Sequence, residues 1–120
     1  MSIHISNLEE VYFNQIKNGE KIYELRVFDE KRRKIKNNDK WIFVNKNSNE
    51  NNKIILQTLV RQINIYESFE EAINETDISK LLPGIETKEE CLEIYNNFDG
   101  YEEKSKELGV VRFTLYIIEN

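Results

Sequence analysis

The sequence predicts an α+β fold, a small, curled, mostly antiparallel β-barrel of about five strands flanked by helices. Its expected strands are not separated by regular helices, which argues against a parallel, doubly wound sheet. The longest of them, residues 53–66, switches its apolar phase near Arg61 and Gln62, which predicts a β-bulge of the kind that curls a sheet. At 120 residues the chain is long enough for one core, so we expect a single domain over residues 1–120.

The chain begins with a short strand followed by a helix. Residues 2–5 alternate in polarity, and apolar residues recur at helical spacing from 8 to 17. Asn7 is the expected N-cap of this helix, and Asn18 with Gly19 ends it.

The next strand, residues 21–28, departs from the simple pattern of one apolar face and one polar face. Glu24 and Arg26 lie on a face bounded by Ile22 and Phe28, so two charges share a face that is apolar at both ends. This pattern predicts a pocket wall or a second, partly buried surface.

Two further strands and a final strand complete the sheet. Residues 39–45 and 53–66 are predicted as strands joined by an Asn-rich hairpin loop. Residues 110–118 alternate in apolar character and close the chain as the last strand.

The stretch between the last two strands is helical. Ser68 and Thr87 each begin a capping box, and Asp77 is placed to cap a short helix that ends before Pro83. Cys91 falls on the apolar side of the helix that follows Thr87. We therefore expect this cysteine to be a small core hydrophobe.

Composition excludes several classes of protein. No apolar run approaches the ~20 residues that a membrane span needs, and the N-terminal residues do not resemble a secretory signal. One cysteine and one histidine leave no disulfide and no clustered metal ligands. We expect no metal, no cofactor and no membrane, with the cytoplasm as the default location.

Charge is unevenly distributed along the chain. Residues 1–60 hold 11 Lys/Arg and 8 Asp/Glu, whereas residues 61–120 hold 6 and 14. The basic excess is concentrated in residues 31–36. A positive field over the whole molecule is absent, but a local basic edge for nucleic acid stays open. The alternative is a solvated loop beside an acidic helical surface.

Residues 19–26, which read GEKIYELR, follow the first helix and lead into a strand. This G-x-K-x-x-E-x-R arrangement resembles the ASCH domain family, whose fold is the PUA-like β-barrel. The likeness continues through residues 28–33, 41–43, 66–71 and 109–111, and so covers essentially the whole chain. Asn38 stands where the family usually has glycine, and asparagine tolerates the same left-handed turn.

The resemblance implies RNA or a nucleotide-like ligand in a cleft beside the first helix and the motif strand. Some ASCH proteins are similar to small hydrolases that deacylate an acetylated cytidine or cleave RNA. In the deacylating branch the motif lysine works with a threonine and a glutamate. Lys21 matches that lysine, but Glu24 stands where that branch has threonine, so this nucleophile is missing.

The chemistry of the motif makes Lys21, Glu24 and Arg26 the expected ligand-binding centre. Lys21 binds a phosphate or carbonyl oxygen as an ammonium ion, and acts as a base or nucleophile as a neutral amine. Glu24 and Arg26 can present a carboxylate to a base amino group and a guanidinium to a phosphate. The simpler interpretation is that Glu24 and Arg26 brace the barrel and Lys21 is solvated.

Other residues are weaker candidates for ligand binding. Arg32 and Arg33 belong to the basic run, and His4 faces away from its apolar neighbours and is expected near the cleft or in a capping role. The aromatic residues that can stack on bases are Tyr12, Tyr23 and Trp41.

Three functions are consistent with this sequence. The first is a module that binds RNA or a nucleotide-like ligand. The second is a small hydrolase, a ribonuclease or a nucleoside amidohydrolase, with Lys21 and Glu24 as catalytic residues. The third is a protein-interaction domain whose acidic helices form the working surface.

Overall fold

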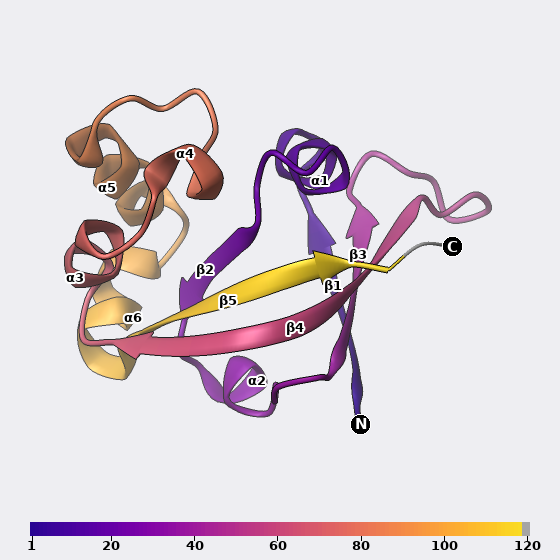
Figure 1. Ribbon diagram of the computed structural model, residues 1–120, viewed down its shortest axis with the longest axis horizontal. Helices are drawn as coiled ribbons and strands as arrows, with labels where there is room; N and C mark the ends of the chain where they lie inside the picture. Colours follow the sequence, from indigo (N-terminus) through magenta and orange to yellow (C-terminus); the bar gives the residue numbers. More distant parts are fainter. Residues whose placement is uncertain (119–120) are drawn as a thin grey trace.

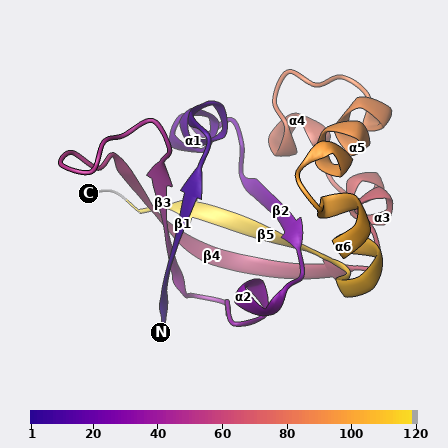
Figure 2. The same cartoon turned by 180° about the vertical axis from the view of Figure 1, so that it is seen from behind.

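Five strands form one mixed sheet in the order β1-β3-β4-β5-β2 (Figures 1 and 2). The computed structural model describes residues 1–118 of the chain. The strands are β1 (Ile3–Leu8), β2 (Tyr23–Val27), β3 (Lys40–Asn45), β4 (Ile55–Tyr66) and β5 (Val110–Ile117). β1 runs parallel to β3, and every other neighbouring pair is antiparallel. The sheet is therefore mostly antiparallel, as the sequence predicts.

Strand β4 supplies much of the curvature. It is 12 residues long and pairs with β3 through its first half and with β5 along most of its length. Its register against β5 shifts between Val60 and Gln62, so the predicted β-bulge is confirmed. The sheet curls into a half-barrel flanked by helices, and the predicted fold class is confirmed (Figure 1).

Six helices flank the sheet of the described chain. They are α1 (Glu10–Lys17), α2 (Glu30–Arg33), α3 (Phe69–Asn74), α4 (Ile78–Leu81), α5 (Lys88–Asn97) and α6 (Tyr101–Leu108). The side chains of Ser68, Asp77 and Thr87 accept hydrogen bonds from backbone N–H groups of the helices that follow them. These three predicted caps are confirmed.

Two hydrophobic cores lie on opposite faces of β2 and β5. One fills the half-barrel around Trp41 and Phe113. The other lies between the sheet and α3–α6, which gather on the left in Figure 1, and includes Leu25 and Phe69. Cys91 is fully buried in this second core, as predicted, and burial raises the pKa of its thiol to about 11.

The start of α1 differs from the prediction. β1 extends to Leu8, which pairs with Asn45 and buries its side chain in the half-barrel. Asn7 therefore lies in the strand and caps nothing; the N-cap is Glu9, whose side chain makes no capping hydrogen bond. Pairing with β3 and burial of Leu8 outweigh the local preference of Asn7 for a cap.

Two turns depend on residues in the left-handed region. Asn38 has a φ of 73° before β3, which confirms the expected turn. Gly100 has a φ of 75° and lets α6 begin at Tyr101. The predicted helices of this stretch end with the one that follows Thr87, and none is predicted over Tyr101–Leu108, because these residues are mostly charged and give little apolar periodicity.

Candidate functional site

The motif residues lie on β2, an edge strand of the sheet, and on the turn before it. Leu25 and Val27 face the helical core. Glu24 and Arg26 alternate with them and point into the half-barrel, where the Arg26 guanidinium lies 5.9 Å from the Trp41 ring centre. The two faces of the strand are thus divided as the alternation predicts, with both charges on the inner face.

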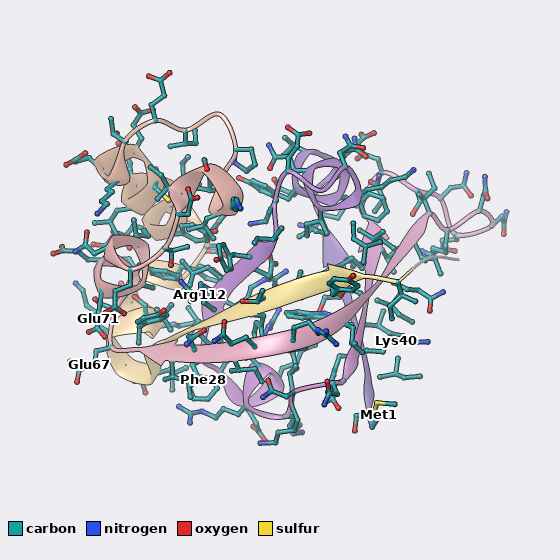
Figure 3. The ribbon with its side chains drawn as sticks, viewed as in Figure 1. Met1, Phe28, Lys40, Glu67, Glu71 and Arg112 are labelled. Atoms are coloured by element: carbon teal, nitrogen blue, oxygen red, sulfur yellow. The ribbon has the colours of Figure 1, made fainter. Side chains whose placement is uncertain are left out.

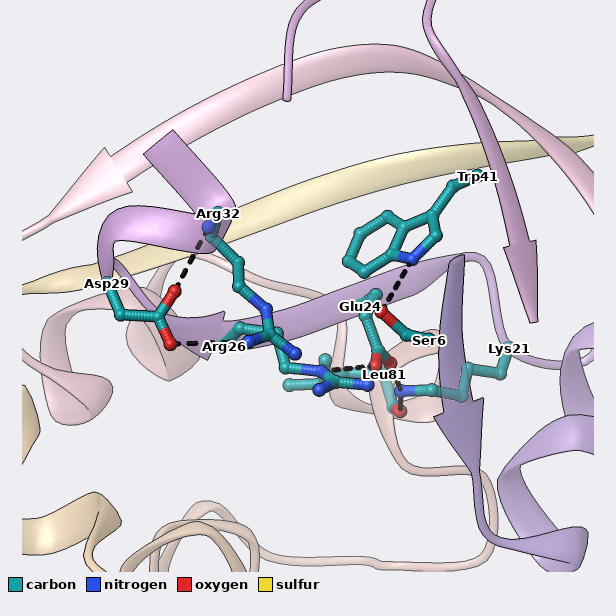
Figure 4. A network of polar contacts seen from close by, with 8 residues as sticks. All are labelled: Ser6, Lys21, Glu24, Arg26, Asp29, Arg32, Trp41 and Leu81. Atoms are coloured by element: carbon teal, nitrogen blue, oxygen red, sulfur yellow. Dashed lines mark hydrogen bonds and ion pairs between the residues drawn. The ribbon is translucent and has the colours of Figure 1, made fainter. Parts of the chain in front are cut away.

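Lys21, Glu24 and Arg26 form one buried charge cluster (Figure 4). Lys21 is 2% exposed; its Nζ donates to the Leu81 carbonyl at 2.6 Å and lies 3.7 Å from Glu24 Oε1. Arg26 Nε donates to Glu24 Oε2 at 2.6 Å. The alternative of a solvated lysine is wrong, because the turn after α1 directs Lys21 inward against Leu81 and Tyr12.

The protonation of this cluster is set by burial and by the neighbouring charges. Burial lowers the pKa of Lys21, Glu24 raises it and Arg26 lowers it further, and the net direction is down. Burial alone would raise the pKa of Glu24, but the charges of Arg26 and Lys21 outweigh it and hold that pKa below its usual range. Glu24 is therefore an anion at neutral pH, and it faces two cations.

The cluster opens onto a cavity of about 180 Å³, here called the charged pocket. Lys21, Glu24 and Arg26 contribute charged groups to its lining, as do Glu9, Lys46 and Asp99. Its aromatic lining comes from Tyr12, Tyr95, Phe98 and Tyr101. The pocket thus combines a charged cluster with an aromatic wall, the usual composition of a site for a small ring-shaped group.

The charged pocket lies where the half-barrel does not close. Its lining includes Asn7 and Leu8 at the end of β1, and Lys21, Glu24 and Arg26 at β2. β1 and β2 are the two edge strands of the sheet. Curling brings these edges toward one another without pairing them, and the gap between them is here called the seam.

Of the two predicted arginines on α2, Arg32 points toward the charge cluster and Arg33 points away. Arg32 Nη1 lies 3.2 Å from Asp29 Oδ2, and the positive charge of Arg32 helps to lower the pKa of Glu24 (Figure 4). Arg33 instead lies 4.1 Å from the Phe28 ring centre and donates to the carbonyl of Leu108. The basic run therefore divides between two surfaces.

His4 lies away from the charged pocket. Its Nε2 is 2.8 Å from Asp39 Oδ2, at the start of β1 and β3. Burial by itself would raise the pKa of Asp39, but hydrogen bonds with His4 and with the backbone N–H groups of Ser2 and Lys36 hold it at about 2. His4 is thus part of a closed pair that joins two strand ends.

Two of the three aromatic candidates do not reach the charged pocket. Tyr23 packs on the Arg112 guanidinium, 4.7 Å from the ring centre, on the opposite face of β2. Trp41 is fully buried and its Nε1 donates to Ser6 Oγ, so it has no free face for a base. Tyr12 lines the pocket.

Of the aromatic wall, the sequence pattern predicts only Tyr12 as a candidate for ligand binding. Tyr95, Phe98 and Tyr101 are spaced by three residues and were assignable only as core, because the same spacing describes the buried side of a helix. Their rings are in mutual contact, with centres 5.7 Å apart for Tyr95 and Phe98 and 5.5 Å apart for Phe98 and Tyr101. Tyr101 follows the turn at Gly100 and joins the other two rings in the pocket lining.

Within residues 1–118 no group of three or more His, Cys, Asp or Glu side chains is arranged to hold a metal ion. No helix in the same part of the chain has the length and apolar character to cross a membrane.

Comparison with known proteins identifies the family. The ASCH domain model matches residues 7–118, which include the charge cluster, the aromatic wall and all five strands except the start of β1. The chain belongs to the ASCH domain family. ASCH domains are often linked to RNA binding, and the half-barrel is consistent with their PUA-like fold.

Two solved structures resemble this ASCH domain over nearly its full length. Hypothetical protein PH0355, a crystal structure, has a TM-score of 0.81 and 35% identity, covering 98% of this chain and 100% of that one. Protein PF0455 from Pyrococcus furiosus, solved by NMR, has a TM-score of 0.77 and 32% identity, with 98% and 99% coverage. A comparison with curated proteins finds no match.

Proposed function

We propose that this ASCH domain binds RNA or a nucleotide-like ligand and that the charged pocket receives one base-sized group. The observation that carries the proposal is the buried cluster of Lys21, Glu24 and Arg26 facing a cavity with aromatic walls. A dry cavity of about 150 Å³ is known to accept a benzene-sized ring. The volume of about 180 Å³ in this pocket therefore suits a single planar ring rather than a duplex.

In this proposal the charged residues of the pocket bind the edge of the ring and the aromatic residues bind its face. Lys21 and Arg26 donate hydrogen bonds, and the Glu24 carboxylate accepts them, so together they match a ring edge that carries both donors and acceptors. Phe98 and Tyr101 offer apolar surface to the face of the ring. Burial of Lys21 and Glu24 strengthens their polar contacts, because the local dielectric is low.

A second candidate, hydrolysis, rests on one observation. Burial lowers the pKa of Lys21, which increases the share of neutral amine available as a base or nucleophile. Glu24 opposes this shift and occupies the position at which the deacylating branch has threonine. Turnover of a panel of RNAs and modified nucleosides by the wild-type protein, with no turnover by Lys21→Met, would favour hydrolysis over simple binding.

The proposed function is tested by titrating the protein with ribonucleosides and with short single-stranded RNA while recording amide NMR spectra. The expected shifts gather at Glu24, Leu82 and Phe98 around the pocket. Phe98→Ala should weaken binding about tenfold, as expected when one stacked ring is lost. Tyr116→Ala is the matched control, because Tyr116 is a 62% exposed aromatic residue outside the pocket.

Two outcomes would contradict the proposal. One is an absence of shifts with every nucleoside and RNA. The other is equal weakening by Phe98→Ala and Tyr116→Ala, which would place the contact outside the pocket. A protein partner captured equally well after nuclease treatment, through the acidic helices, would then be the better account.

A further inference from the structure

The seam continues the charged pocket toward α2. Arg26 lines the pocket, and the Arg32 side chain extends toward it from α2 (Figure 4). Lys31, also on α2, donates from Nζ to the Ile5 carbonyl at 3.2 Å, on β1. Its pKa is lowered by partial desolvation and by the positive charges of Arg32 and Arg26.

The charges along this line do not balance. The lining of the charged pocket is itself balanced, with the cations Lys21, Arg26 and Lys46 and the carboxylates Glu9, Glu24 and Asp99. On α2, by contrast, Lys31 and Arg32 are two cations, and Asp29 is the carboxylate that pairs with Arg32. The Arg32 side chain is only 14% exposed, so water screens its charge weakly, whereas Lys31 is exposed. The excess of positive charge lies at the α2 end, because Glu24 already contacts both Lys21 and Arg26.

One edge of the Arg32 guanidinium has no hydrogen-bond partner among the described residues. Nη1 is bound to Asp29, whereas Nε is buried and has no hydrogen-bond partner among the described residues. The edge formed by Nε and Nη2 is one of the two that bind a phosphate through parallel hydrogen bonds. Arg112 Nε is unpaired too, but that guanidinium packs against two tyrosine rings and has no cation beside it within the described contacts.

We propose that Lys31 and Arg32 form a phosphate subsite in the seam, next to the charged pocket, for the phosphate that adjoins the group bound in the pocket. The inference rests on the proposed function and narrows it: the ligand is a nucleotide or an RNA strand rather than a free nucleoside. The phosphate supplies the negative charge that the seam lacks, and the free edge of Arg32 and the Lys31 ammonium supply the donors.

The test compares ligands that differ only in phosphate. The four ribonucleosides, their 5′-monophosphates and a mixed-sequence hexaribonucleotide are titrated by calorimetry at several salt concentrations. We expect the phosphorylated ligands to bind about tenfold more tightly than the nucleosides, the gain typical of one charge-assisted contact. If both the monophosphates and the hexaribonucleotide bind more tightly than the nucleosides, a free nucleotide is a sufficient ligand. If only the hexaribonucleotide does, the ligand is an RNA strand. Either gain in affinity supports the subsite.

Arg32→Gln and Arg33→Gln make a matched pair, since the two arginines are neighbours on α2 and point to different surfaces. Arg32→Gln should abolish the preference for phosphate. It should also reduce the slope of log affinity against log salt concentration for the hexaribonucleotide by about 0.7, the contribution of one phosphate contact on a single strand. Lys31→Gln should act in the same direction. Arg33→Gln should keep most of the preference.

The outcomes separate the two proposals. Equal affinity of wild-type protein for nucleosides and nucleotides, or equal loss in Arg32→Gln and Arg33→Gln, would overturn the phosphate subsite and leave the proposed function standing. Binding of none of the ligands would overturn the proposed function, and the subsite with it. Melting curves of the three variants exclude unfolding as the cause of any loss.

Discussion

Two buried cationic sites lie on opposite faces of β2 and β5, a cluster around Lys21 and the single arginine Arg112, and they differ in what surrounds them. On the inner face, Lys21 and Arg26 share Glu24 and border a cavity. On the outer face, Arg112 is 9% exposed and is enclosed by the protein (Figure 3). Its guanidinium donates to Thr76 Oγ1 at 2.6 Å and also contacts Asn64.

From this difference we propose that the outer arginine serves folding and that the inner cluster serves a ligand. Arg112 ties β5 to β4 and to the end of α3, through hydrogen bonds to Asn64 and to the Glu75 carbonyl, and two tyrosine rings cover it. The cluster around Lys21 joins fewer elements and carries two cations against one carboxylate. Buried ion pairs of this kind contribute little net stability, so their presence beside a cavity is better explained by binding.

The largest expected effect comes from breaking the enclosed site at Arg112. Arg112→Met removes hydrogen bonds from three protein groups and should lower the free energy of unfolding by about 3 kcal/mol, because buried polar partners are left unpaired. Ligand binding should persist in the folded fraction. Urea unfolding measures the loss, and Arg61→Met, an exposed arginine on the Tyr116 ring, is the control that should change little.

Glu24→Gln should cost somewhat less, about 2 kcal/mol at pH 7, because it leaves Lys21 and Arg26 as buried cations without a counter-charge. The pKa of Glu24 is lower in the folded protein than its ordinary value of 4.5, so its stabilising contribution is present above that pH. It is lost as pH falls through the lowered folded pKa. The difference between variant and wild type in urea unfolding should therefore shrink in acid; a constant difference would contradict the account.

The pair formed by Asp39 and His4 extends the comparison to a polar contact that does not line the charged pocket. The pKa of Asp39 is about 2 in the folded protein against 3.8 ordinarily, which corresponds to about 2 kcal/mol of stability at neutral pH. This contribution is present above pH 4 and disappears as pH falls through about 2. Asp39→Asn should thus be destabilised at pH 7 and match wild type near pH 1.5, with nucleotide binding at pH 7 unchanged. A binding defect would show that the strand ends at His4 affect the pocket.

Much of the fold was predictable, because it depends on local patterns. The bulge in β4 follows from the phase switch near Gln62, and the caps at Ser68 and Thr87 follow from their spacing to glutamate. Asn7 was assigned to the wrong element, because its pairing partner is 37 residues away in β3 and no local pattern reports it. The helix α6 was missed for the opposite reason, since its sequence is polar on nearly every side.

The site was predictable only in part. The motif placed Lys21, Glu24 and Arg26 together, and the alternation along β2 put both charges of the strand on one face. The burial of Lys21 was not foreseen, because it depends on the Leu81 carbonyl, 60 residues further along the chain. Arg32 and Arg33 are indistinguishable in sequence, and only the orientation of α2 separates them.

The central claim is that the cluster around Lys21 is kept for binding rather than for stability. Lys21→Met tests it most directly, because methionine fills the same space without the charge. Burial lowers the pKa of Lys21, so at neutral pH the folded state bears a cost for keeping this group protonated, and the variant escapes that cost. The lost hydrogen bond to Leu81 offsets the gain, and the free energy of unfolding should change by less than about 1 kcal/mol.

Urea unfolding and nucleotide titration of Lys21→Met, measured beside Arg112→Met, give the decisive pair of numbers. The account predicts that Lys21→Met keeps its stability and loses nucleotide affinity by tenfold or more, an amount equivalent to about 1.4 kcal/mol. It predicts the reverse for Arg112→Met, with stability lost and affinity kept. A Lys21→Met protein that unfolds as readily as Arg112→Met yet binds nucleotides like wild type would contradict the claim.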